Sequence, residues 1–289
     1  MNLPVFPSFK SLELEDRDIL KPFFERYPLE ISESTFGNHF IWRRFDHPRF
    51  TLINDNLCFC FSPPDEPAYF LQPLGETDIP ATLKTCLTTA PRLSRIPVSF
   101  AGLWCEGFHC APDRDQFDYV YRTSDLMELR GKKFDGKRNR IRKFEKSHTY
   151  RYLKLGPSDR EACRTLFEEW LADKGVNGGA IDAQKDSIAE ALVGFDSLGM
   201  TGGAIETEGR IAALSIGERL NIETAVIHIE IVSPRYDGLA QLMNREFVRH
   251  EWADCSYINR EQDLGVPGLR GAKLSYHPHH LVEKYHIWA

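Results

Sequence analysis

The second half of this 289-residue chain contains a run of segments that permits few folds. Residues 200–233 hold three β-rich segments in close succession, and Glu208-Gly209 between the first two is typical of a tight hairpin turn. Before this meander we predict a strand, a helix capped by Ser158 and a second helix around 188–195. After it we predict a helix and then a strand at 256–263. Antiparallel strands with helices at both ends of the run predict an α+β unit.

The first half predicts a similar order. Residues 9–14 favour a short strand that a helix follows, and RFTLINDNLCFCF predicts a hairpin around Asn54-Asp55-Asn56. The other predicted elements are a strand at 68–75, a helix at 79–90, and strands at 97–105 and 117–122. Strand, helix, three-stranded meander, helix and strand is the order of an N-acyltransferase core. We therefore predict two such domains, at 1–128 and 129–289; one mixed α+β domain with extensions is the alternative.

The composition is typical of a globular protein that is not embedded in a membrane. With 42% hydrophobic and 27% charged residues, the chain can bury two cores. No apolar run approaches the roughly 20 residues that a membrane helix needs, and the first residues lack a signal-peptide pattern. The 7 cysteines are scattered and odd in number, which predicts a cytoplasmic protein without a disulfide framework. The histidines and cysteines lack zinc-site spacing, so we expect no metal.

Positive charge is concentrated at 130–146. This segment has nine basic and two acidic residues, about +7, in a chain whose net charge is -6. Phe134, Ile141 and Phe144 follow helical spacing and predict an amphipathic helix. Such a helix at the start of the second domain could bind nucleic-acid phosphates, or it could be a solvated connecting helix. The candidate nucleic-acid-binding residues are Lys132, Lys133, Lys137, Arg138, Arg140, Arg142 and Lys143.

The segment VIHIEIVS contains the first candidate for chemistry. Side chains alternate between the faces of a strand, so the isoleucines at 227, 229 and 231 share one face and His228 and Glu230 share the other. An isoleucine face is expected to pack on helices. A carboxylate held near apolar strands gains strength as a general base, which makes Glu230 the candidate base. The alternative is that both polar side chains line a solvated face.

The turn after this strand contains the pattern R-x-x-G-x-A. It consists of Arg235, Gly238 and Ala240, and acyl-CoA transferases place such a pattern at a strand-to-helix junction. Glycine there lets the backbone approach pyrophosphate, which the free N–H groups of the helix can bind. The alternative is an ordinary helix start that contains glycine.

The C-terminal segment from 257 to 285 combines charged residues with three glycines. Alternating cations and carboxylates suit a pocket for a phosphate or an acyl ester, where a cation stabilises the developing oxyanion. A surface network of salt bridges is the alternative. The charged and phenolic residues of this segment that we single out are Arg260, Glu261, Asp263, Arg270, Lys273, Tyr276 and Lys284.

The same segment resembles a known family. The order D-L-G-x-x-G-L-R-x-x-K-x-x-Y-x-P followed by K-Y, at 263–285, is similar to the catalytic C-terminal domain of phosphatidylglycerol lysyltransferases. It resembles more closely the stand-alone bacterial proteins that are grouped with them. Further matches are S-E-S-T-F-G-N-H-F-I-W-R at 32–43, G-K-K-F-x-x-K-R-N at 131–139, I-H-I-E at 227–230 and I-N-R-E-x-D-L-G at 258–265.

The resemblance implies two tandem GNAT-like folds, as in Fem-type aminoacyltransferases. It also implies transfer of an aminoacyl group from aminoacyl-tRNA to an amine or hydroxyl acceptor, with no further cofactor. The membrane half of the lysyltransferases has no counterpart here, so a lipid and a small molecule both stay open as the acceptor. Two alternatives also stay open: an N-acetyltransferase that uses acyl-CoA through Arg235, Gly238 and Ala240, and a non-catalytic module that binds RNA or a small molecule.

The resemblance also suggests roles for individual residues. Arg270 and Lys273 correspond to the cations of the family motif, and Glu261 and Asp263 to its carboxylates. In our hypothesis Glu230 accepts the acceptor's proton, Lys273 or Arg270 stabilises the oxyanion or a phosphate, and Tyr276 donates to the leaving oxygen. The residues expected to contact substrate are His228, Arg260, Glu261 and Arg270, with Asn38, Trp42 and Arg43 of the first domain on the acceptor side.

Overall fold

The computed structural model describes residues 3–28, 30–174 and 179–289. The chain folds into two compact units. The first comprises Met1–Asp118, Gln262–Pro267 and Leu281–Ala289, and the second comprises Tyr119–Glu261 and Gly268–His280. Each described sheet has seven strands.

The sheet of the first unit has the order β1-β2-β3-β4-β5-β14-β6. Its strands are β1 (Lys10–Ser11), β2 (Arg49–Ile53), β3 (Asn56–Phe61), β4 (Tyr69–Phe70), β5 (Arg92–Pro97), β6 (His109–Pro112) and β14 (Lys284–Trp288). The predicted hairpin is confirmed, because β2 pairs antiparallel with β3. Its turn residues Asn54 and Asp55 both adopt positive φ, the conformation that a two-residue hairpin turn requires.

Strand β3 carries the core of the first unit on both of its faces. Cys58 and Cys60 face a cluster that includes residues of helices α4 (Ile79–Thr89) and α5 (Val98–Trp104). Phe59 and Phe61 face the opposite way, toward α1 (Arg17–Arg26) and α2 (Phe36–Ile41), where they contact the His39 ring. A short helix, α3 (Arg43–Asp46), leads into β2. Because both faces are covered, every residue of β3 is buried.

One prediction for the first unit is wrong, and one feature of it was not predicted. The segment at 97–105 is mostly helix α5, and the strand is the preceding one, β5. Phe100, Ala101 and Trp104 of α5 pack into the core beside that strand, whereas Val98 and Leu103 are exposed. The structure also contains one disulfide, between Cys105 and Cys110, across a five-residue separation. The other described cysteines are free and buried, so there is no wider disulfide framework among the described residues.

The sheet of the second unit has the order β13-β7-β12-β11-β10-β9-β8. Its strands are β7 (Asp118–Arg122), β8 (Tyr150–Lys154), β9 (Thr201–Thr207), β10 (Arg210–Arg219), β11 (Thr224–Val232), β12 (Tyr257–Asn259) and β13 (His280–Val282). The predicted meander β9-β10-β11 is confirmed, with its first turn at Glu208 and Gly209, both at positive φ. Strand β12 lies parallel to β11, as expected for a strand that returns through a helix.

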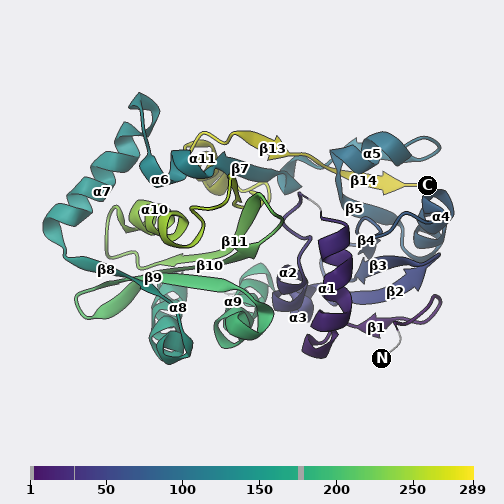
Figure 1. The fold of residues 1–289 in the computed structure, drawn as a ribbon, viewed down its shortest axis with the longest axis horizontal. Helices are drawn as coiled ribbons and strands as arrows, with labels where there is room; N and C mark the ends of the chain where they lie inside the picture. The colour runs from purple at the N-terminus through teal and green to yellow at the C-terminus, as the bar shows by residue number, and fades with distance from the viewer. Residues whose placement is uncertain (1–2, 29, 175–178) are drawn as a thin grey trace. The chain divides into compact units, whose positions relative to one another are not determined.

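Helices cover both faces of this second sheet. Helices α8 (Arg160–Lys174) and α9 (Gly179–Leu198) lie on one side of β9 and β10, and α10 (Leu239–Glu251) lies on the other (Figure 1). Helix α7 (Asp135–Ser147) and helix α6 (Thr123–Glu128) both pack against α10, and α11 (Pro267–Leu274) precedes the last strands. Of the helices in the described part of the chain, none has the length and hydropathy to cross a membrane.

The compact units differ from the predicted domains at two places. Strand β7, which we expected to close the first domain, pairs with β12 in the second sheet, so the division falls at 118/119 rather than 128/129. The C-terminal strand β14 pairs with β5 and β6 in the first sheet. Strand partners more than 130 residues apart leave no local sequence signal, which is why periodicity placed both strands in the wrong unit.

Candidate active site

The candidate active site is built on strand β11. Ile229 and Ile231 are buried, as the alternation predicted. The pairing with β10 slips by one residue in this strand, because Ile216 lies opposite Ile229 and Gly217 lies opposite Ile227. His228 therefore occupies a β-bulge, a feature that redirects a side chain and often borders functional sites.

His228 lies between two carboxylates. Its Nε2 is 3.0 Å from Oε1 of Glu218, and its Nδ1 is 2.7 Å from Oε1 of Glu261. Ionised carboxylates only accept hydrogen bonds, so both ring nitrogens must donate and the ring is an imidazolium. Burial by itself lowers the pKa of His228, but these two hydrogen bonds outweigh burial and raise the pKa to about 10. At neutral pH His228 is thus a buried cation and not a proton acceptor.

Glu230 forms an ion pair with Arg260, which directly follows β12. Nε of Arg260 donates to Oε2 of Glu230 at 3.1 Å, and Nη2 donates to the same oxygen. The sequence suggested that apolar side chains surround the Glu230 carboxylate, but in the structure it pairs with the guanidinium of Arg260. The Glu230 side chain is still 25% exposed, so its carboxylate is accessible from solvent.

Two tyrosines stack around Arg260. Its guanidinium carbon lies 5.0 Å from the ring centroid of Tyr276 and 5.8 Å from that of Tyr121. Burial raises the pKa of Tyr276 to about 12, although nearby Arg260 opposes the shift. The Tyr276 phenol therefore keeps its proton at neutral pH and can donate it.

Lys273 ties the end of β12 in place. Its ammonium donates to the backbone carbonyl oxygen of Arg260 and, at 3.0 Å, to that of Glu261. The hydroxyl of Tyr121 donates to the carbonyl oxygen of Lys273 at 2.9 Å. Since Lys273 is only 8% exposed and bonds to backbone, its visible effect is to position the residues that pair with Glu230 and His228.

Helix α7 contributes one of its basic residues to the cluster of Glu230, Arg260 and Tyr276. The ammonium of Lys137 donates to Oγ of Ser275 at 2.6 Å and lies 4.0 Å from the ring centroid of Tyr276. Burial, and then repulsion from Arg260 and Arg140, lower the pKa of Lys137. The sequence had placed Lys137 among residues for nucleic acid and had no signal for this contact, because Tyr276 is 139 positions away.

The other basic residues of the segment 130–146 lie on helix α7 or just before it. Phe134, Ile141 and Phe144 are buried, so the predicted apolar stripe is confirmed. Four of the basic residues pair with carboxylates: Arg130 with Glu128, Lys133 with Asp125, Arg138 with Asp135 and Lys143 with Asp237. Arg142 donates to the side-chain oxygen of Asn139. Among the described residues, Lys132 and Arg140 are exposed and have no hydrogen bond or ion pair.

The R-x-x-G-x-A turn is covered by α7. Gly238 has a φ of +89° at the start of α10, and a Cβ there would lie 2.2 Å from the carbonyl oxygen of Arg140. The backbone that closely approaches this glycine is therefore that of α7. Arg235 lies 3.8 Å from a carboxylate oxygen of Glu169, and Ala240 follows in the first turn of α10.

The remaining predicted site residues belong to other environments. Asp263, in the first unit, is fully buried; it accepts from Arg114 at 3.3 Å and from the backbone N–H of Gly265 at 2.9 Å, which stabilises its own loop. Arg270 is half-buried on α11. The described residues contain no group of three or more histidine, cysteine, aspartate or glutamate side chains that could hold a metal ion.

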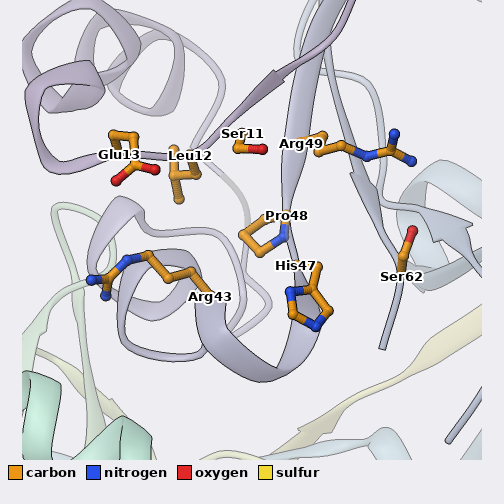
Figure 2. Close-up of a pocket in the computed structure, with 8 residues that line it drawn as sticks. All are labelled: Ser11, Leu12, Glu13, Arg43, His47, Pro48, Arg49 and Ser62. Atoms are coloured by element: carbon orange, nitrogen blue, oxygen red, sulfur yellow. The ribbon is translucent and has the colours of Figure 1, made fainter. Parts of the chain in front are cut away.

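The predicted acceptor residues lie in α2 and α3 of the first unit. Asn38 is buried in α2, and Trp42 follows the last residue of that helix. Arg43 lies 3.7 Å from the Phe40 ring centroid and borders a cavity of about 450 Å³. Figure 2 shows this cavity, whose other lining residues are Ser11, Leu12, Glu13, His47, Pro48, Arg49 and Ser62. The Arg43 guanidinium points away from the His47 ring, so these basic groups do not converge on one point (Figure 2).

Sequence reasoning missed a buried ionic network in the first unit. Lys284 of β14 is fully buried, 2.6 Å from a Glu33 oxygen and 2.7 Å from an Asp118 oxygen. The attraction of these carboxylates outweighs burial and raises the pKa of Lys284. Ser32 also donates to Asp118. The two carboxylates that pair with Lys284 lie 166 and 251 positions away from it in the sequence, so no local sequence pattern could reveal them.

Comparison with known proteins identifies the family and the fold. Residues 24–288 match the family model described as phosphatidylglycerol lysyltransferase, C-terminal. A conserved protein of unknown function from Bacteroides thetaiotaomicron is 31% identical, with 99% of each chain covered and a TM-score of 0.88. L-PGS from Bacillus licheniformis is 17% identical over 100% of this chain and 94% of its own, with a TM-score of 0.65. FemX is 9% identical over 96% of both chains, with a TM-score of 0.61. No curated protein matches this sequence.

These likenesses confirm the predicted fold class, two mixed sheets flanked by helices in a tandem GNAT-like arrangement. Family and fold together support an acyltransferase in general. On the match that spans 24–288, the chain belongs to the family of phosphatidylglycerol lysyltransferase C-terminal domains.

Proposed function

We propose that this chain transfers an aminoacyl group from aminoacyl-tRNA to an amine or hydroxyl acceptor. The observation that carries the proposal is that basic helix α7 reaches, through Lys137, the cluster of Glu230, Arg260 and Tyr276. An aminoacyl-tRNA offers an ester next to a chain of phosphates, which calls for acid–base groups beside a basic surface. The family's name, which describes lysyl transfer, is consistent with an aminoacyl donor.

In the proposed reaction Glu230 and Tyr276 move protons. The acceptor's nitrogen or oxygen attacks the carbonyl carbon of the ester, and its proton passes to the Glu230 carboxylate. The bond from that carbon to the ribose oxygen then breaks, and the Tyr276 phenol protonates the departing oxygen. The proton on Glu230 afterwards returns to the phenolate, directly or through water, so both groups end as they began.

The neighbouring charges hold these two groups in position. The cations of Arg260 and Lys137 would stabilise the oxyanion of the tetrahedral intermediate. Lys273 and the His228 imidazolium are positioning residues, because they bind the backbone and the carboxylates around Glu230 rather than a reacting atom. Binding of the donor would draw Arg260 away from Glu230 and leave the carboxylate able to accept a proton.

The two other hypotheses make different demands on the chain. An acyl-CoA donor would need the start of α10 for its pyrophosphate, and the α7 backbone at Gly238 disfavours that position. A non-catalytic binding module would bind RNA and tolerate the loss of Glu230.

The test is a transfer assay with the full chain. Pooled tRNA charged with labelled amino acids is incubated with the protein and either a small-molecule extract or a lipid extract, and label that leaves the tRNA is followed. We expect Glu230→Gln and Tyr276→Phe each to lower the rate by roughly 10²–10⁴-fold. Glu206→Gln is the matched control, since Glu206 is a carboxylate on β9 that is 26% exposed, nearly as much as Glu230, and pairs with Arg151 at 2.8 Å.

Two results would contradict this proposal. One is full transfer activity in both Glu230→Gln and Tyr276→Phe. The other is no transfer from any charged tRNA together with release of free thiol from acyl-CoA, which would identify a thioester donor.

A further inference from the structure

Two cations lie against one buried ring near the start of α7. Lys137 and Arg260 lie 4.0 Å and 5.0 Å from the ring centroid of Tyr276. Arg140, about one turn after Lys137 on α7, carries a third positive charge, which acts to lower the pKa of the same phenol. The carboxylate of Glu230 pairs with Arg260 there. The three cations and this carboxylate leave an excess of positive charge.

The excess of positive charge is concentrated around Lys137. The charged groups that act on its ammonium are Arg260 and Arg140, which are both cations. Nη1 of Arg260 is buried and has no hydrogen-bond partner among the described residues. Like charges held this close cost energy unless an anion lies between them. Lys137 is half-buried, whereas Arg140 and Ser275 are exposed, so the cluster can be reached from solvent.

We infer that Lys137, Arg140 and Arg260 form a subsite for a phosphate ester beside Tyr276. Donors on three separate side chains suit the tetrahedrally arranged oxygens of a phosphate. A planar carboxylate would need only the paired N–H groups of a single arginine. Lys132, which is exposed and lies five residues before Lys137 in the same segment, favours a ligand with more than one phosphate.

This inference rests on the proposed function, and it specifies where the donor is held. The phosphate is the last phosphodiester before the aminoacylated ribose, so that binding it places the ester carbonyl next to Glu230. A phosphate on a small acceptor has the same chemistry and is the alternative source, which the experiment distinguishes.

The experiment measures binding to the full chain by fluorescence anisotropy. The probe is a labelled five-nucleotide RNA with the 3′ sequence of tRNA, titrated at several salt concentrations. Lys137→Gln and Arg140→Gln are each expected to weaken binding about ten-fold and to reduce the slope of log K against log salt by roughly 0.7. Lys146→Gln is the matched control: it removes the same charge from the same helix about 13 Å away and should bind like the unchanged protein.

Competition distinguishes the two sources of phosphate. If the RNA binds and 10 mM glycerol phosphate does not displace it, the donor is the source. If the RNA does not bind but glycerol phosphate does, as shown by a rise in the thermal unfolding midpoint, the result would support the subsite and overturn the donor as its source. Unchanged RNA affinity in both Lys137→Gln and Arg140→Gln would overturn the subsite, and if transfer activity persists the proposed function still stands. Thermal unfolding midpoints of all variants should match, which excludes misfolding as the cause of weak binding.

Discussion

Replacement of His228 by glutamine tests the central electrostatic feature of the second unit. The imidazolium lies within hydrogen-bond distance of Glu218 and Glu261 and is only 1% exposed. Glutamine can hydrogen-bond to one of these carboxylates but carries no charge, so His228→Gln leaves two carboxylates facing each other without a cation. Loss of one member of a buried ionic group costs about 3–5 kcal/mol, and we expect that loss of unfolding free energy at pH 7.

The pH dependence gives an independent magnitude. The pKa of His228 is raised from 6.5 to about 10 in the folded protein. A raised pKa means that the folded state holds the proton more tightly, so the stabilisation is fully present below pH 6.5 and is lost as the pH rises to 10. At 1.36 kcal/mol for each pKa unit, the stabilisation at stake is on the order of 5 kcal/mol. The unfolding free energy should therefore fall between pH 7 and 10 by more in the unchanged protein than in His228→Gln.

The assay is urea unfolding followed by tryptophan fluorescence at pH 6, 8 and 10. His250→Gln is the control, because His250 is an exposed histidine at the end of α10, 3.5 Å from a Glu246 oxygen. A loss below about 1 kcal/mol for His228→Gln, or a nitrogen NMR spectrum showing a neutral His228 ring at pH 8, would refute this account of the site.

The other predictions concern helix packing and the buried lysine. Gly238→Ala should lower the unfolding free energy by about 2–4 kcal/mol, from positive φ and from the clash with the α7 backbone. Gly209→Ala, which has positive φ and open space, should cost only about 1 kcal/mol in the same urea assay; equal losses would exclude close packing at 238. Lys284→Met should cost about 3–5 kcal/mol because it leaves two buried carboxylates without their cation, whereas Lys154→Met on the surface should cost under about 1 kcal/mol. If Lys284→Met unfolds at the same urea concentration as the unchanged protein, the network contributes no net stability.

The contacts of helix α7 connect the packing of the second unit to its candidate active site. Helix α7 packs on the start of α10 with its buried stripe and brings Lys137 to Tyr276 with its polar face. The same helix therefore covers the start of α10 and supplies charge to the cluster around Glu230. A substitution that loosened α7 would affect stability and ligand binding together, whereas Lys137→Gln should weaken binding without a loss of stability.

Local sequence determined several features of both units. Residue alternation and turn chemistry act over fewer than ten positions, and they correctly predicted the hairpins at Asn54-Asp55 and Glu208-Gly209 and the meander. Helical spacing also predicted the buried stripe of α7. These features depend on neighbours in the chain, whose geometry each residue type controls directly.

Only the tertiary structure decided which distant groups meet. Glu230 and His228 were recognised as candidates from one strand, but their partners Arg260, Glu218 and Glu261 come from other elements, and these partners turn His228 into a cation and Glu230 into half of an ion pair. Contacts between distant parts of the chain also explain why strand β7 of the first half joins the second sheet and strand β14 of the second half joins the first sheet. Strand pairing and charge pairing across a fold are chosen by the burial of surfaces from remote parts of the chain, and no short stretch of residues encodes that choice.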